Sequence, residues 1–220
     1  MNSIFLSYQN SSQYFLEHIQ ETKILPASEY FESLPDDAIY DYSLFKNSVV
    51  TKLYSEQGEF RFFEMPDHGT GFLTKIGSSI QVEINSINQL HLELYQWFGS
   101  IIDSYSMDSN KDLLPYNNVF LVSETIFGLG SFEADYMDKC KASHTSPNEK
   151  FLRLATIATE SNGNLVQYDK DSNIYFYLAD HIPNQAHLVK ARDVPDDTFY
   201  TASGASSLKD WVDSYFGQFL

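Results

Sequence analysis

Residues 49–84 read VVTKLYSEQGEFRFFEMPDHGTGFLTKIGSSIQVEI and decide the fold class. β-Branched and aromatic residues fill short runs in this stretch, and glycines at positions 58, 69, 71 and 77 separate the runs. Such side chains favour strands, whereas glycine favours the turns between them. The stretch therefore predicts a β-meander.

Helical periodicity follows the meander and returns at the end of the chain. Ser86 is placed to cap a helix with Gln89 reaching back, and an apolar stripe from Leu90 to Tyr105 predicts a helix over these residues. Ser207 precedes a second stripe and predicts a closing helix with one buried face. That stripe consists of Leu208, Trp211, Val212, Tyr215, Phe216 and Phe219. Shorter helical patterns follow Ser11–Ser12, follow Pro26 and occupy Phe132–Cys140.

A second strand-rich stretch occupies the C-terminal half. Its candidate strands are residues 119–122, 151–157, 165–168, 174–178 and 187–189. No repeat, low-complexity tract or linker divides the sequence. We therefore expect a single α/β (α+β) domain over residues 1–220, with a mixed or antiparallel sheet flanked by helices and an elaborated N-terminal half.

The charge balance restricts the class of partner. The chain has 30 acidic and 14 basic residues, a formal net charge of -16 and a pI near 4.5. This field repels the phosphate backbone, so we expect no nucleic-acid partner. A protein with a basic surface is favoured, because opposite fields speed encounter. The alternative is that the acidity serves solubility alone.

The sequence predicts a cytoplasmic protein. Cys140 is the single cysteine and cannot form an intramolecular disulfide, which fits a reducing compartment. The N-terminus has no basic region followed by an apolar one, and no stretch approaches the roughly 18 apolar residues of a membrane span. We therefore expect neither export nor a membrane partner.

Candidate catalytic and metal-binding residues form incomplete sets. Cys140 and His144 have the spacing of a thiolate and its base, but no further group completes a centre, so a surface thiol is predicted. Asp169 begins a run like a calcium loop, yet Ile174 stands where that loop needs glycine. The histidines lack zinc spacing, and nucleotide-binding glycine motifs are missing. We predict a protein without catalytic residues, metal or cofactor. A small hydrolase that uses Cys140 or a pair of acidic residues is an alternative.

Three segments follow one another in the C-terminal half: FLRLATI (151–157), NGNLVQYD (162–169) and NIYFYLADH (173–181). Their order resembles that of the SUKH superfamily. The glycines of 127–130 are similar to the family's glycine-containing break, and the closing helix resembles the family's last helix. The resemblance covers roughly residues 119–216. Residues 1–110 diverge, because Leu25–Pro26 and Tyr30–Phe31 match an early family helix but the expected Asn-Gly-Gly is missing.

This resemblance implies a function as well as a fold. SUKH members are α/β proteins with a mixed or antiparallel sheet, flanking helices and no common catalytic site. Many are bacterial immunity proteins, which bind and neutralise a cognate toxin that is often a nuclease. The expectation is an immunity protein whose toxin has a basic surface. An intracellular scaffold or regulatory domain of the same fold is the alternative.

The predicted contact surface lies on polar turns and sheet ends. Asp169, Asp171 and Asp180 are expected to project carboxylates that mimic phosphates, and Tyr175 and Tyr177 are expected to supply aromatic contact area. In the alternative interpretation, the two tyrosines share one strand face and pack against a helix.

Overall fold

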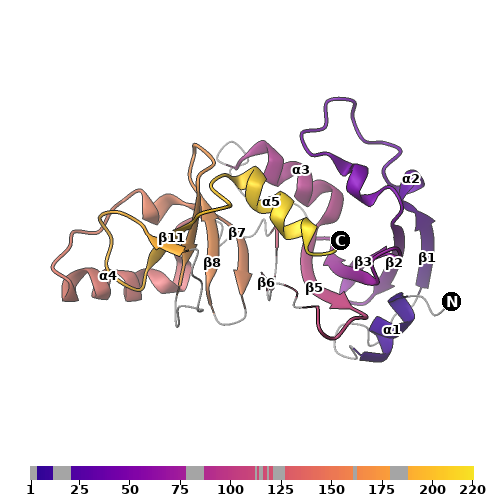
Figure 1. Ribbon diagram of the computed structural model, residues 1–220, viewed down its shortest axis with the longest axis horizontal. Coiled ribbons are helices and arrows are strands. Elements are labelled where there is room, and N and C mark those ends of the chain that lie inside the picture. The colour runs from indigo at the N-terminus through magenta and orange to yellow at the C-terminus, as the bar shows by residue number, and fades with distance from the viewer. Residues whose placement is uncertain are drawn as a thin grey trace.

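The computed structural model describes residues 4–11, 21–77, 87–111, 113, 116–117, 119–120, 127–160, 163–178 and 188–220. It is an elongated α+β protein with two antiparallel sheets and few helices, which confirms the predicted class (Figure 1). No helix within these ranges is long and apolar enough to cross a membrane.

The first sheet has the strand order β1-β2-β3-β4-β5. Its strands are β1 (Glu21–Pro26), β2 (Val49–Ser55), β3 (Gly58–Met65), β4 (Thr70–Lys75) and β5 (Ser100–Ser106). The predicted meander is confirmed for β2 to β4, which pair as consecutive antiparallel neighbours. Its last expected run, residues 80–84, lies outside the described residues.

The prediction of one long helix that reaches Tyr105 is wrong for its second half. Helix α3 covers Gln89–Phe98, with Asn88 as its N-cap and Gly99 as its C-cap. Gly99 has a φ of 73°, and its N–H bonds the Tyr95 carbonyl at 2.7 Å. With its ψ of −156°, this is a backbone conformation that is open almost only to glycine, so the helix ends at Gly99. The chain then continues as β5, whose residues pair with β4.

The second sheet has the order β10-β11-β9-β8-β7-β6. Its strands are β6 (Tyr116–Asn117), β7 (Ala155–Glu160), β8 (Leu165–Tyr168), β9 (Ile174–Tyr177), β10 (Leu188–Lys190) and β11 (Phe199–Ala202). The strand expected at 151–157 begins later than predicted, because residues 151–153 form a 3-10 helix. Ile101 and Val119 exchange backbone hydrogen bonds of 2.9 Å, which joins the two sheets and leaves β1 and β10 at opposite ends.

The largest core cluster lies where the sheets meet. Helices α3 and α5 (Leu208–Gly217) cover it, and its members come from both sheets (Figure 1). The predicted closing helix is confirmed: Ser207 and Asp210 form a capping box, and the predicted stripe is buried. Phe216 is at the centre, with its ring 4.9 Å from that of Phe45 and 5.2 Å from that of Phe98.

Two smaller clusters extend the core at either end. Helix α4 (Glu133–Ala142), which confirms the short helix predicted there, packs against β9 and β11. Cys140 is buried in this cluster, so the expectation of a surface thiol is wrong. Helix α1 (Ile4–Ser11) packs on the first sheet, and the helix predicted after Ser11–Ser12 lies outside the described residues. The pattern after Pro26 forms only the short helix α2 (Ala27–Tyr30).

Candidate functional site

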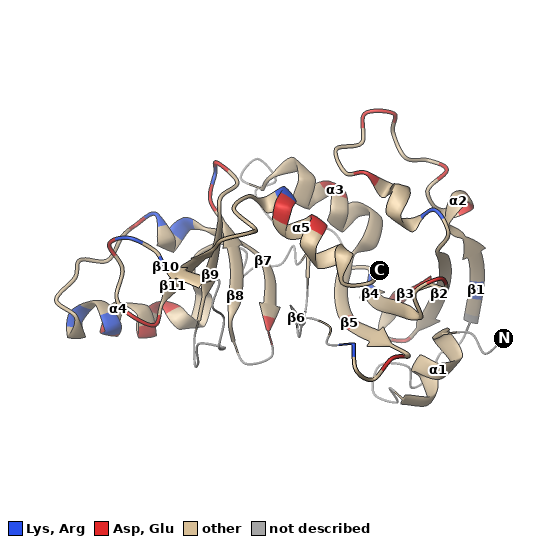
Figure 2. Cartoon of the chain, viewed as in Figure 1, with Lys and Arg blue, Asp and Glu red and all other residues tan. Residues whose placement is uncertain are grey.

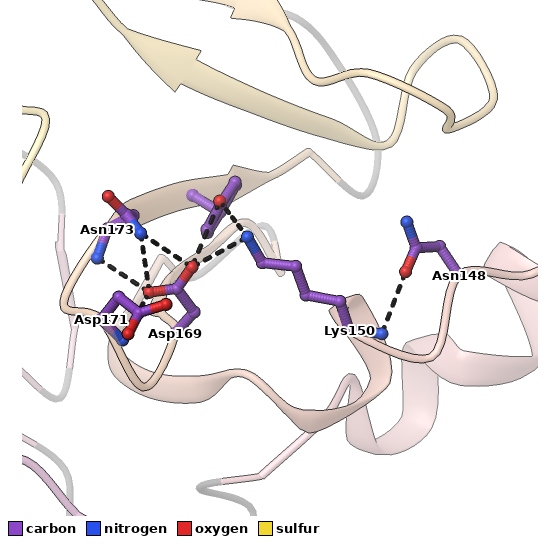
Figure 3. Close-up of polar contacts among 6 residues, drawn as sticks. Asn148, Lys150, Asp169, Asp171 and Asn173 are labelled. Atoms are coloured by element: carbon purple, nitrogen blue, oxygen red, sulfur yellow. Dashed lines mark hydrogen bonds and ion pairs between the residues drawn. The ribbon is translucent and has the colours of Figure 1, made fainter.

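The predicted acidic surface does not present Asp169 to solvent. The Asp169 side chain is only 5% exposed and forms an ion pair of 2.9 Å with Lys150 Nζ. The backbone N–H groups of Asp171 and Asn173 donate to its Oδ1 at 2.9 and 3.0 Å, and Asn173 Nδ2 donates to both carboxylate oxygens at 3.0 Å (Figure 3). The carboxylate therefore points into the turn formed by residues 169–173, and its hydrogen bonds hold the backbone of that turn in place.

The electrostatics of Asp169 agree with this geometry. Burial favours the neutral acid, but the hydrogen bonds from Lys150 and Asn173 outweigh burial and lower the pKa of the carboxyl below its usual value. Its oxygens are occupied by protein donors, so they are not arranged for a partner or a calcium ion. Of the predicted acids, Asp171 is exposed, and Asp180 lies outside the described residues.

The two predicted aromatic anchors are buried. Tyr177 packs with α4 and donates its hydroxyl hydrogen to Asp135 Oδ2 at 2.8 Å. Tyr175 lies in the same cluster, and its hydroxyl accepts a hydrogen bond of 2.6 Å from Lys150 Nζ. The alternative interpretation, in which these tyrosines share a strand face and pack against a helix, fits their burial. Of the predicted contact residues that the structure describes, only Asp171 is exposed.

A different surface combines exposed acids with an exposed apolar side chain. We call residues 36–41 the acidic segment, because Asp36, Asp37 and Asp41 are all exposed there. Ile39 lies among them with 52% of its surface exposed. Figure 2 shows acidic residues along this loop, which extends beyond α2. Exposed carboxylates around an apolar side chain are suited to protein recognition.

The acidic segment is held in place by one residue of α3. Glu93 Oε2 accepts a hydrogen bond of 2.7 Å from the Ile39 N–H, and Glu93 Oε1 accepts one of 2.9 Å from the Tyr40 N–H. The Tyr42 hydroxyl donates to the same Oε1 at 3.1 Å. The Asp41 side chain caps the 3-10 helix at residues 42–45 by accepting from the Ser43 N–H at 2.9 Å. These bonds fix the backbone on both sides of Ile39.

Helix α5 extends the acidic surface. The ring of Tyr40 lies 5.5 Å from that of Phe216, which brings the acidic segment against α5. Burial raises the pKa of Tyr40, and the charges of Asp213 and Asp41 raise it further. Both carboxylates therefore lie near this ring, together with Lys209, which pairs with Asp213 at 2.6 Å.

Sequence reasoning missed this surface, although a signal was present. Pro35 followed by Asp36 and Asp37 is a turn signal between apolar runs. The contact that orders the turn comes from Glu93, which is more than 50 residues away in the chain. A contact between residues so far apart in the chain cannot be predicted from periodicity or local spacing.

Glu93→Ala is expected to loosen the acidic segment, because the substitution leaves two backbone donors and one hydroxyl without their acceptor. Hydrogen bonds to a charged group contribute about 1.5–3 kcal/mol each, and water will replace part of this, so we expect the free energy of unfolding to fall by about 2 kcal/mol. Chymotrypsin should cleave faster after Tyr40.

Urea melts and timed digestion measure both effects. Gln96→Ala, at an exposed position of the same helix, is the control. Digestion at the wild-type rate would show that Glu93 does not anchor the segment.

The described residues contain no group of three or more His, Cys, Asp and Glu side chains that could hold a metal ion. Comparison of the chain with protein-family models, with curated proteins and with solved structures found no match.

Proposed function

We propose that this chain is a cytoplasmic immunity protein that binds a cognate toxin through the acidic segment and neutralises it. The observation that carries the proposal is the ordered exposure of Asp36, Asp37 and Asp41 around Ile39. The toxin is expected to have a basic contact surface, as nucleases have where they hold phosphate.

Three physical features favour this function. The net charge of -16 steers a basic partner toward the protein and raises the association rate. Glu93 holds the acidic segment before any partner arrives, so less conformational entropy is lost on binding. Ile39 supplies apolar area at the centre of the charged surface. The resemblance of residues 119–216 to the SUKH superfamily supports the same class of function.

The test is co-expression with each candidate toxin encoded beside the gene, in a host that the toxin kills. The wild-type chain should restore growth. Asp36→Lys combined with Asp37→Lys should abolish protection and slow association by about tenfold or more at low salt, because like charges then oppose encounter. The melting temperature should stay near that of wild type, since both side chains are exposed.

The matched control combines Glu56→Lys with Asp171→Lys, two exposed acids outside the acidic segment. It changes the net charge by the same amount, so it separates the position of the charge from its total. The control should protect as wild type does. The proposal fails if no neighbouring toxin is relieved, or if the Asp36/Asp37 reversal protects with an unchanged salt dependence.

A further inference from the structure

A second feature lies at the other end of the molecule, next to edge strand β10. A hollow of about 430 Å³ opens between residues 148–151, strand β9 and the strands β10 and β11. Its volume falls within the range of small-molecule sites. It is lined by Asn148, Lys150, Phe151, Tyr175, Val189, Lys190, Ala191, Arg192 and Thr201.

The lining of this hollow is cationic on a protein that is strongly acidic. Lys150, Lys190 and Arg192 line it, and none of its lining residues is Asp or Glu. A comparable hollow of about 480 Å³ beside α2 also has three basic residues, but Glu29 and Glu32 line it too. Figure 2 shows basic residues gathered around α4 and β10. The positive lining is therefore a local property and not a consequence of composition.

Lys150 is fixed at one side of the hollow. Its Nζ lies 2.9 Å from Asp169 Oδ2 and 2.6 Å from the Tyr175 hydroxyl (Figure 3). Burial opposes the charged form of Lys150, but the hydrogen bonds to Asp169 and Tyr175 outweigh burial and raise its pKa. Lys150 thus stays protonated, and the buried carboxylate of Asp169 balances its charge.

The other two cations are not balanced by a buried carboxylate. Lys190 pairs at 2.5 Å with Asp196, whose side chain is 84% exposed, so water competes for this pair. The Arg192 side chain is exposed and forms no hydrogen bond or ion pair with the residues that the structure describes. Arg192 therefore offers its full charge to a ligand, and Lys190 offers its charge when a ligand displaces the exposed Asp196 carboxylate.

The remaining lining is apolar. The Phe151 ring meets the Tyr175 ring at 5.3 Å in an edge-to-face contact, and both residues line the hollow. Val189, whose surface is 62% exposed, and Ala191 also line it. An aromatic or aliphatic part of a ligand has apolar atoms to contact there, next to the charged groups.

We propose that this hollow binds a phosphate monoester carried on a small aromatic group. Such a phosphate has a charge of about −1.5 to −2 near pH 7, so it can pair with Arg192 and also compete with Asp196 for Lys190, which a singly charged carboxylate does less well. The planar guanidinium of Arg192 can donate two parallel hydrogen bonds to phosphate oxygens. The Lys150 ammonium, the Tyr175 hydroxyl and Thr201 supply further polar groups.

The test is titration of the ¹⁵N-labelled full chain with phenyl phosphate at constant ionic strength, followed by amide chemical shifts. Saturable shifts are expected for residues 148–151 and 189–192, with inorganic phosphate and benzoate each binding more weakly. Arg192→Gln and Lys190→Gln should each weaken phenyl phosphate about tenfold. Lys141→Gln is the matched control, because Lys141 lies on α4, pairs with Asp138 and does not line the hollow. The control should bind as wild type does.

Three results would overturn the site. The first is no saturable shift up to about 20 mM phenyl phosphate, which corresponds to negligible affinity. The second is equal weakening by Lys141→Gln and Arg192→Gln, which would indicate attraction to net charge alone. The third is benzoate or inorganic phosphate binding as tightly as phenyl phosphate, which would contradict the ligand class. Unchanged spectral dispersion in each variant shows that it is folded.

Discussion

Phe216→Ala should lower the free energy of unfolding by about 3–5 kcal/mol, the cost of truncating a large aromatic residue in a packed core. Phe216 is fully buried on α5, and its ring lies within 6 Å of those of Phe45, Phe98 and Phe120. These partners come from three separate segments, so the ring links parts of the chain that only the fold brings together. Its removal leaves a cavity that their rings cannot all move to fill.

Urea denaturation of Phe216→Ala and of Ser214→Ala measures this effect. Ser214 is exposed on the same helix, so its substitution should change the free energy of unfolding by less than about 0.5 kcal/mol. A loss below about 1 kcal/mol for Phe216→Ala would contradict the placement of α5 over the junction of the sheets, because burial of that ring is what the placement requires.

The sequence predicted elements whose signals are local. The meander of β2 to β4 has strand-forming runs separated by turns, and the closing helix has both a cap and a helical stripe. The helix predicted after residue 86, which in the structure ends at Phe98, shows the limit of such patterns. Ile101, Ile102 and Tyr105 continue the stripe of α3, yet Gly99 ends the helix and the same residues form β5. An apolar pattern of this kind is compatible with a helix or with a strand, and pairing with β4 makes these residues a strand. That pairing is not visible in the sequence.

The candidate sites depend on contacts between distant segments. Acidic side chains on a polar turn are usually solvated, so the sequence alone predicts Asp169 at the surface. Lys150, nineteen residues earlier, binds its carboxylate and turns it inward. Glu93 orders the acidic segment in the same long-range manner. The hollow beside β10 combines residues from the 3-10 helix, β9, β10 and β11, so the sequence could not show it.

Asp169→Ala should lower the free energy of unfolding by about 3 kcal/mol, because it removes the acceptor for Lys150, Asn173 and the Asp171 N–H. Lys150 is half-exposed, so its ammonium is hydrated again once Asp169 is removed. The expected fall in the free energy of unfolding is therefore at the lower end of the range for a broken buried ion pair. Asp171→Ala is a matched control two residues away in the same turn. Its side chain is exposed, so the change should stay within about 0.5 kcal/mol.

The pH dependence of this difference gives an independent measurement. The pKa of Asp169 is lower in the folded protein than its usual value of about 3.9, so its contribution is complete above that value. As the pH falls through the folded-state pKa, the carboxylate is protonated and the contribution is lost. The free energies of unfolding of wild type and Asp169→Ala should therefore differ by the full amount near pH 7 and converge in acid. The difference between wild type and Asp171→Ala should stay the same at every pH. Urea melts between about pH 7 and pH 3 test this. A difference between wild type and Asp169→Ala that stays constant over that range would show that the Asp169 charge does not stabilise the turn, and that the loss arises from packing alone.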